Sequence, residues 1–75
     1  MHLSDCKINE NVKILDINAG KSAKSNLNNM GLKIGDIVFV KSKSPIKGPI
    51  VIKCKENDIA IGNGLAKKIN VERLN

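Results

Sequence analysis

Residues 30–40 read Met-Gly-Leu-Lys-Ile-Gly-Asp-Ile-Val-Phe-Val, and this stretch decides the fold. Gly31 follows a polar segment, and we expect it to end a helix in the left-handed conformation that glycine adopts without strain. Gly35 predicts a tight turn two residues before an apolar run, and residues 37–41 are predicted to form a strand. A helix that folds directly onto a strand indicates a small barrel-like domain.

The segments on either side of this stretch have the turn signals of further short strands. Ser22 is predicted to cap a helix over residues 22–30, in which Leu27 and Met30 belong to one narrow apolar stripe. A single helical turn is expected at residues 65–66. The expected strands span residues 12–17, 37–41, 50–55, 59–61 and 68–71. The chain is therefore mainly β, and short strands with tight turns favour a closed or half-closed barrel with one short helix after the first strand.

Two connections between these strands also have predicted roles. Residues 56–58 are expected to form a turn. Residues 42–49 are polar and contain Pro45 and Pro49, which excludes a central strand. We expect this loop to be the mobile, partner-facing part of the chain.

The 75 residues predict a single domain, residues 1–75, which buries only ~60% of its unfolded surface. We therefore expect the core to use every large apolar residue. No run of ~18 apolar residues predicts a membrane span, and no charged segment followed by an apolar one predicts a secretory signal. Cys6 and Cys54 are too few for a disulfide framework. These features predict a soluble protein of the cytosol.

The net charge of +6 comes from twelve lysines and one arginine against seven acidic residues. Such a charge favours acidic partners, either a nucleic acid or an acidic protein face. Phe39 is the only aromatic residue and Arg73 the only arginine, so the chain lacks stacking platforms and bidentate phosphate contacts. This composition argues against nucleic acid.

Metal binding and catalysis are both disfavoured by the pattern of reactive residues. His2, Asp5, Cys6 and Cys54 are of types that bind divalent iron. However, we expect His2 to lie at a frayed terminus and Cys54 to face inward from its strand as a small core residue. The lone histidine has no orienting partner for acid–base or nucleophilic chemistry. We therefore predict no metal site, no cofactor and no enzymatic activity.

The order of these pieces closely resembles FeoA-type proteins of ferrous-iron transport, over roughly residues 3–74. The resemblance implies an SH3-like barrel and a cytosolic accessory that binds and modulates FeoB, a ferrous-iron permease with a GTP-binding domain. It implies no catalysis, no small-molecule substrate and no membrane insertion. The residues that carry it, in the family's spacing, are Leu27, Met30-Gly31-Leu32, Gly35, Gly48-Pro49-Ile50, Ile59-Ala60-Ile61, Ala66, Ile69 and Val71.

Five residues are candidates for contact with such a partner. Leu27 and Met30 are either apolar anchors for the partner or contacts between the helix and the barrel. Lys21, Lys24 and Lys47 are candidates for electrostatic steering, although lysines at such positions also serve solubility alone. The family often has arginine around the helix, where this chain has Lys21, Lys24 and Asn26.

A second hypothesis is a basic SH3-like barrel that binds RNA or a ribosomal surface. The segment 33–38 also suits the strand-turn-strand of small RNA-associated barrels. Binding of this kind is mostly to phosphate, so its affinity falls steeply as the salt concentration rises. The low arginine and aromatic content weighs against this alternative.

Overall fold

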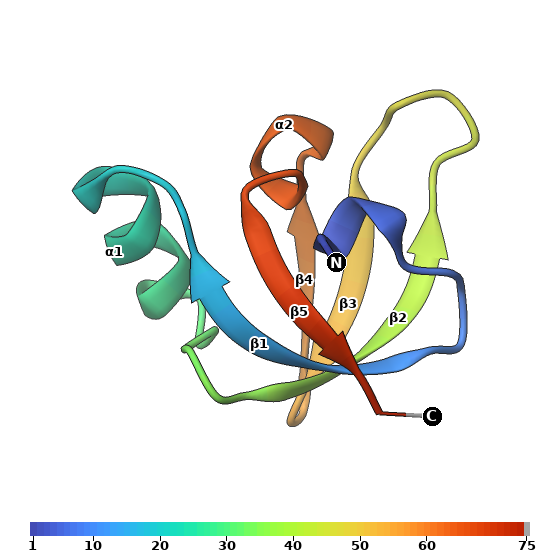
Figure 1. Cartoon of the computed structure of the whole chain (residues 1–75), viewed down its shortest axis with the longest axis horizontal. Helices are drawn as coiled ribbons and strands as arrows, with labels where there is room; N and C mark the ends of the chain where they lie inside the picture. Colours follow the sequence, from blue (N-terminus) through green and yellow to red (C-terminus); the bar gives the residue numbers. More distant parts are fainter. Residues whose placement is uncertain (75) are drawn as a thin grey trace.

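The computed structural model describes residues 1–74 and is a small SH3-like barrel, as the sequence predicts (Figure 1). All neighbouring strands are antiparallel and the strand order is β4-β3-β2-β1-β5. The sheet is strongly curled, so β5 crosses in front of β3 and β4. The elements are η1 (Leu3–Asp5), β1 (Asn11–Ile17), α1 (Lys21–Asn29), β2 (Ile37–Lys43), β3 (Ile50–Cys54), β4 (Asn57–Ile61), α2 (Asn63–Ala66) and β5 (Ile69–Arg73).

Two irregularities in strand pairing allow the sheet to curl around its core. The register of β1 on β5 shifts between Ile14 and Asp16, so both Ile14 and Ile17 face inward although they are three residues apart. The register of β2 on β3 shifts in the same way between Val40 and Ser42. Bulges of this kind bend a strand and increase its twist. The buried core is Leu3, Cys6, Val12, Ile14, Ile17, Leu27, Leu32, Val38, Val40, Ile50, Ile52, Cys54, Ile59, Ile61, Ala66, Ile69 and Val71.

The end of α1 is a Schellman motif built on Gly31, which has the expected left-handed φ of 99°. The amide of Gly31 donates to the carbonyl of Asn28 at 3.0 Å, and the amide of Leu32 donates to the carbonyl of Leu27 at 2.9 Å. Leu27 and Leu32 are both buried in the core, the hydrophobic pair that accompanies this motif. The Met-Gly-Leu sequence thus ends the helix and fixes its position on the barrel.

The start of α1 differs from the prediction. Ser22 is not its cap, because the helix begins at Lys21 and Gly20 occupies the cap position without a side-chain hydrogen bond. Gly20 has an extended backbone, with φ −65° and ψ 169°. Serine favours cap positions but does not fix which residue takes the capping geometry, and glycine also adopts it.

Gly35 has the second left-handed backbone of the predicted stretch, with a φ of 96°. The amide of Asp36 donates to the carbonyl of Lys33 at 3.1 Å, and the Asp36 carboxylate accepts the amide of Lys33 at 2.8 Å. Both ends of this four-residue turn are therefore held by the same aspartate. The turn leads directly into β2.

Several strand boundaries also differ from the sequence prediction. Strand β2 runs to Lys43, two residues beyond the predicted end, because Ser42 and Lys43 pair with β3 after the bulge. Strand β4 begins at Asn57, since the turn falls at residues 55–56, where Lys55 takes a φ of 58°. The first strand and β5 also each differ by one or two residues from the predicted bounds.

The N-terminal segment is held more firmly than the sequence suggested. The carbonyl of Met1 accepts the amide of Val71 at 2.8 Å, and His2 forms a β-bridge with Asn70. Leu3 and Cys6 are completely buried. The prediction of a frayed terminus at His2 is therefore wrong, because apolar residues within the next turn anchor this segment in the core.

Candidate partner-binding surfaces

Helix α1 presents its polar face to solvent and only part of its apolar stripe. Lys21 and Lys24 are exposed, and Met30 at the end of the helix is 43% exposed. Leu27 has no exposed surface. Of the two interpretations of Leu27, the structure therefore shows the core contact, whereas Met30 remains available to a partner.

The loop between β2 and β3 holds Lys47 next to a prominent apolar side chain. Ile46 is 84% exposed, and Lys47 adopts a left-handed φ of 40°. The amide of Ser44 donates to the carbonyl of Pro49 at 3.3 Å. A Cβ atom on Gly48 would lie 2.4 Å from the Ser44 side chain, so only glycine fits this loop.

Two further lysines are engaged within the protein. The Lys41 ammonium lies 2.8 Å from the carboxylate of Asp58 on β4. The Lys43 ammonium donates to the carbonyls of Ser4 at 3.0 Å and Cys6 at 2.7 Å. Lys43 therefore stabilises the carboxyl end of η1, where a positive charge is favourable.

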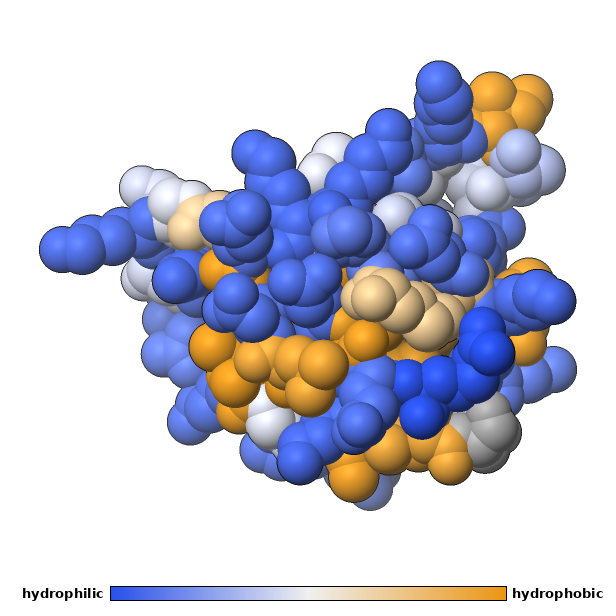
Figure 2. Space-filling model, in the orientation of Figure 1, coloured by the Kyte–Doolittle hydropathy of each residue, from blue (hydrophilic) through white to orange (hydrophobic). Residues whose placement is uncertain are grey.

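Several large apolar residues lie at the surface, so the expectation that the core uses all of them is wrong. Leu15, Ile34 and Ile37 are 48%, 57% and 59% exposed. Apolar surface gathers over the lower part of the face that β1 and β5 form (Figure 2). The missed signal was the alternation along residues 37–40, since Val38 and Val40 face the core and Ile37 must then face outward.

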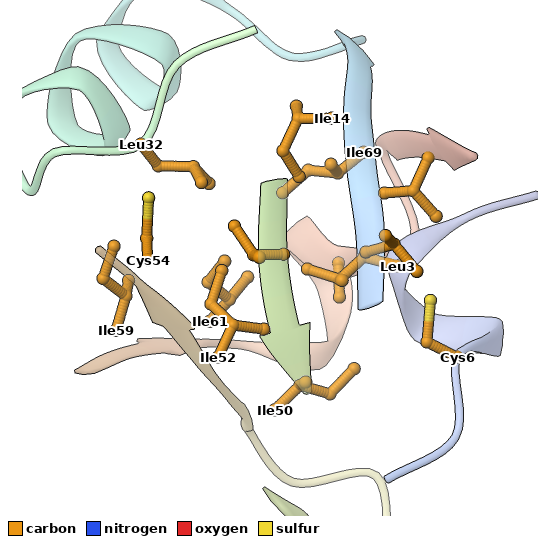
Figure 3. Packing of buried hydrophobic residues seen from close by; sticks show 14 of the residues in the cluster. Leu3, Cys6, Ile14, Leu32, Ile50, Ile52, Cys54, Ile59, Ile61 and Ile69 are labelled. Carbon is orange, nitrogen blue, oxygen red and sulfur yellow. The ribbon is translucent and has the colours of Figure 1, made fainter. Parts of the chain in front are cut away.

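The four residues of the metal hypothesis are divided between two places. The Asp5 carboxylate accepts the amide of His2 at 3.1 Å and lies 3.7 Å from its imidazole Nδ1. Cys6 and Cys54 are free thiols at different sides of the core (Figure 3). Within residues 1–74, no cluster of three or more His, Cys, Asp or Glu side chains has an arrangement that would hold a metal ion.

Neither thiol has the environment of a reactive nucleophile. Burial raises the pKa of Cys6, and the Glu10 carboxylate adds to this effect. Burial also raises the pKa of Cys54, where the charge and hydrogen bond of Asp36 act in the same direction. Because the thiolate is the reactive form, both cysteines are suited to packing.

The surface formed by residues 1–74 contains no pocket for a small ligand. No helix within those residues combines the length and apolar character that a membrane span requires.

The protein is a small SH3-like barrel, and its exposed lysines and exposed apolar side chains form the surfaces described above. The chain belongs to the FeoA family, because the model of the FeoA domain matches residues 1–73. It is 41% identical over 70 residues to the putative Fe(2+) transport protein A of Methanocaldococcus jannaschii, covering 93% of this chain and 83% of that protein.

Solved structures agree with this assignment. The crystal structure of an iron uptake regulatory protein (FeoA) superposes with a TM-score of 0.89 at 32% identity, over 99% of this chain and 97% of that one. The solution structure of FeoA from Chlorobium tepidum gives a TM-score of 0.92 at 24% identity, over 100% of this chain and 71% of that one. The latter likeness concerns the fold alone.

Proposed function

We propose that this protein is a cytosolic accessory of ferrous-iron uptake, which binds a FeoB-type permease and modulates its transport without catalysis of its own. The observation that carries the proposal is membership in the FeoA family over residues 1–73. A relative named as a putative Fe(2+) transport protein supports the link to iron.

The structure supports action by surface contact. Residues 1–74 form no ligand pocket, and burial raises the pKa of their two thiols. The exterior instead offers exposed apolar side chains and an excess of positive charge. A protein of this kind changes a permease only by binding one of its conformational states more tightly than another.

Four of the sequence candidates remain proposed contacts. Lys21, Lys24 and Met30 lie on or at the end of α1, and Lys47 lies in the β2–β3 loop. The lysines raise the rate of association with an acidic face, and Met30 adds apolar contact. Leu27 contributes indirectly, because it holds α1 in place.

The test is a titration of isotope-labelled protein with the soluble cytoplasmic region of the cognate permease, followed by amide chemical shifts. The proposal expects saturable shifts confined to one face at physiological salt. A Met30→Ser, Lys24→Ser variant is compared with a Lys67→Ser, Lys68→Ser variant, which removes exposed residues beyond α2. Absence of shifts for both the soluble region and the full permease in detergent would contradict the proposed function. Binding of a single-stranded RNA that weakens steeply with salt would favour the alternative barrel function.

A further inference from the structure

We infer that the outer face of β1 and β2, centred on Leu15, Ile34 and Ile37, is the docking surface for an acidic protein partner. These three residues are named the β1–β2 patch. The inference rests on the proposed function and adds these residues to the contacts proposed there at the end of α1, which the turn at residues 33–36 follows directly in the chain. It also names the chemistry of the complementary face, which is an apolar centre surrounded by carboxylates.

Backbone pairing brings together the segments that carry the three apolar residues of the patch. The amide of Gly35 donates to the carbonyl of Ile14 at 2.7 Å, and the amide of Ile14 donates to the carbonyl of Asp36 at 2.9 Å. The turn is thereby held against β1, so Leu15 lies beside Gly35. Glycine has no side chain to cover Leu15, and Leu15, Ile34 and Ile37 are each about half exposed.

The patch is rigid for a surface feature, which favours binding. Leu15 and Ile37 lie on paired strands, and Ile34 lies in a turn whose ends are both held by Asp36. The carboxylate of Asp36 is itself 3.6 Å from the Cys54 thiol in the core. A preordered surface loses little conformational entropy when a partner binds.

The charges around the patch indicate an acidic partner. Lys13 is the cross-strand neighbour of Ile37, and Lys53 is the cross-strand neighbour of Phe39, the next outward residue of β2. Lys33 immediately precedes Ile34. No ion pair found within residues 1–74 involves any of these three lysines, in contrast to Lys41. Their charges are therefore available to carboxylates on a second protein.

A protein fits this surface better than an anionic membrane does. Glu72 is the cross-strand neighbour of Lys13, and Asp16 follows Leu15 directly. Both are exposed and would be repelled by anionic lipid. A folded partner can place apolar groups and carboxylates against the patch while it leaves these acidic residues facing water or its own basic groups.

The experiment measures the affinity of the full chain for the soluble cytoplasmic region of the cognate permease. The test variant is Leu15→Thr, Ile37→Thr, in which threonine retains strand preference while removing apolar area. The control is Ile8→Thr, which alters an isoleucine of similar exposure in the segment before β1, outside every proposed contact. The inference expects at least about a tenfold loss of affinity for the test variant and less than about a twofold change for the control. Chemical shift dispersion and melting temperature establish that each variant is folded.

The outcomes separate the inference from the proposed function. If the unaltered chain binds and the folded test variant binds equally well, the docking face is wrong and the accessory function stands. If the unaltered chain binds neither the soluble region nor the full permease in detergent, both are overturned. Binding to phosphatidylglycerol vesicles that the test variant loses would also overturn the assignment of the patch to a protein partner.

Discussion

The Sγ atom of Cys54 lies 3.6 Å from Oδ2 of Asp36, so a buried thiol on β3 is linked to the turn that precedes β2. The same carboxylate oxygen accepts the backbone amide of Lys33 at 2.8 Å. Asp36 therefore connects the core to the turn between Ile34 and Ile37. Figure 3 shows Cys54 on the side of the core where Leu32 enters from the end of α1.

The first prediction concerns the dependence of stability on pH. The pKa values of Cys6 and Cys54 are raised from 9.0, chiefly by burial. Unfolded thiols ionise near this value while the folded ones stay protonated, so the folded state binds more protons and its stability falls as the pH rises above 9.0. Urea unfolding between about pH 8.5 and 10 should show this fall.

A variant that lacks both thiols is the control for this prediction. Cys6→Ala, Cys54→Ala should be less stable at neutral pH because it leaves small cavities, but its stability should decline less steeply in the alkaline range. An equally steep decline in the variant would assign the pH dependence to other groups.

The second prediction concerns Gly31. Gly31→Val should destabilise the protein by about 1–2 kcal/mol or more, because a β-branched residue resists positive φ. The cause is conformational, since a Cβ atom at this position would lie 3.7 Å from the Asn57 side chain, an ordinary contact. Gly64→Ala in α2 has open space and should be neutral or slightly stabilising. Normal melting of Gly31→Val would contradict the role given to the Schellman motif.

The third prediction separates the two apolar residues of α1. Leu27→Ala should cost about 2–5 kcal/mol, because it opens a cavity in the core. Met30→Ala should cost less than about 1 kcal/mol, since Met30 is 43% exposed and lies outside the core. Chemical denaturation measures both. Comparable losses of unfolding free energy in the two variants would show that the helix is placed differently. A loss of partner binding in Leu27→Ala is informative only after the variant has been shown to be folded.

The fourth prediction concerns the Lys43 ammonium. Lys43→Met should destabilise the protein by about 1–2 kcal/mol, because two carbonyls near η1 lose a charged donor. Amide exchange in residues 3–6 and at Val71 should accelerate at the same time. Lys53→Met removes a lysine without a partner in the described ion pairs and should leave both measurements unchanged. Unaltered exchange in the Lys43 variant would show that apolar burial alone holds the N-terminal segment.

The succession of strands along the chain and the end of α1 were predictable because each depends on local chemistry. Gly31 and Gly35 have the positive φ angles that the sequence implied. Alternation along β3 placed Cys54 in the core correctly. Each of these features follows from side-chain spacing or from the conformational freedom of glycine, which neighbouring residues reveal.

The membership of the β1–β2 patch was not predictable in the same way. The alternation of β2 implies that Ile37 faces outward, but it does not tell which residues of other segments lie beside it. Leu15 keeps the outward phase of Lys13, whereas the bulge between Ile14 and Asp16 turns Ile17 inward. Leu15 lies beside the turn because β1 pairs with the chain that follows Gly35. Both facts depend on pairing between distant segments.

The sequence by itself determined the mainly β barrel, the helix ended by Gly31 and the positive charge, because these follow from periodicity, glycine conformation and composition. Only the tertiary structure decided that Leu27 is buried while Met30 is exposed, and that Lys43 is engaged with η1. It also left Leu15, Ile34 and Ile37 exposed at the surface. The physical reason is that burial and proximity arise from long-range strand pairing, and its bulges reverse the inward and outward phase that a sequence pattern assumes.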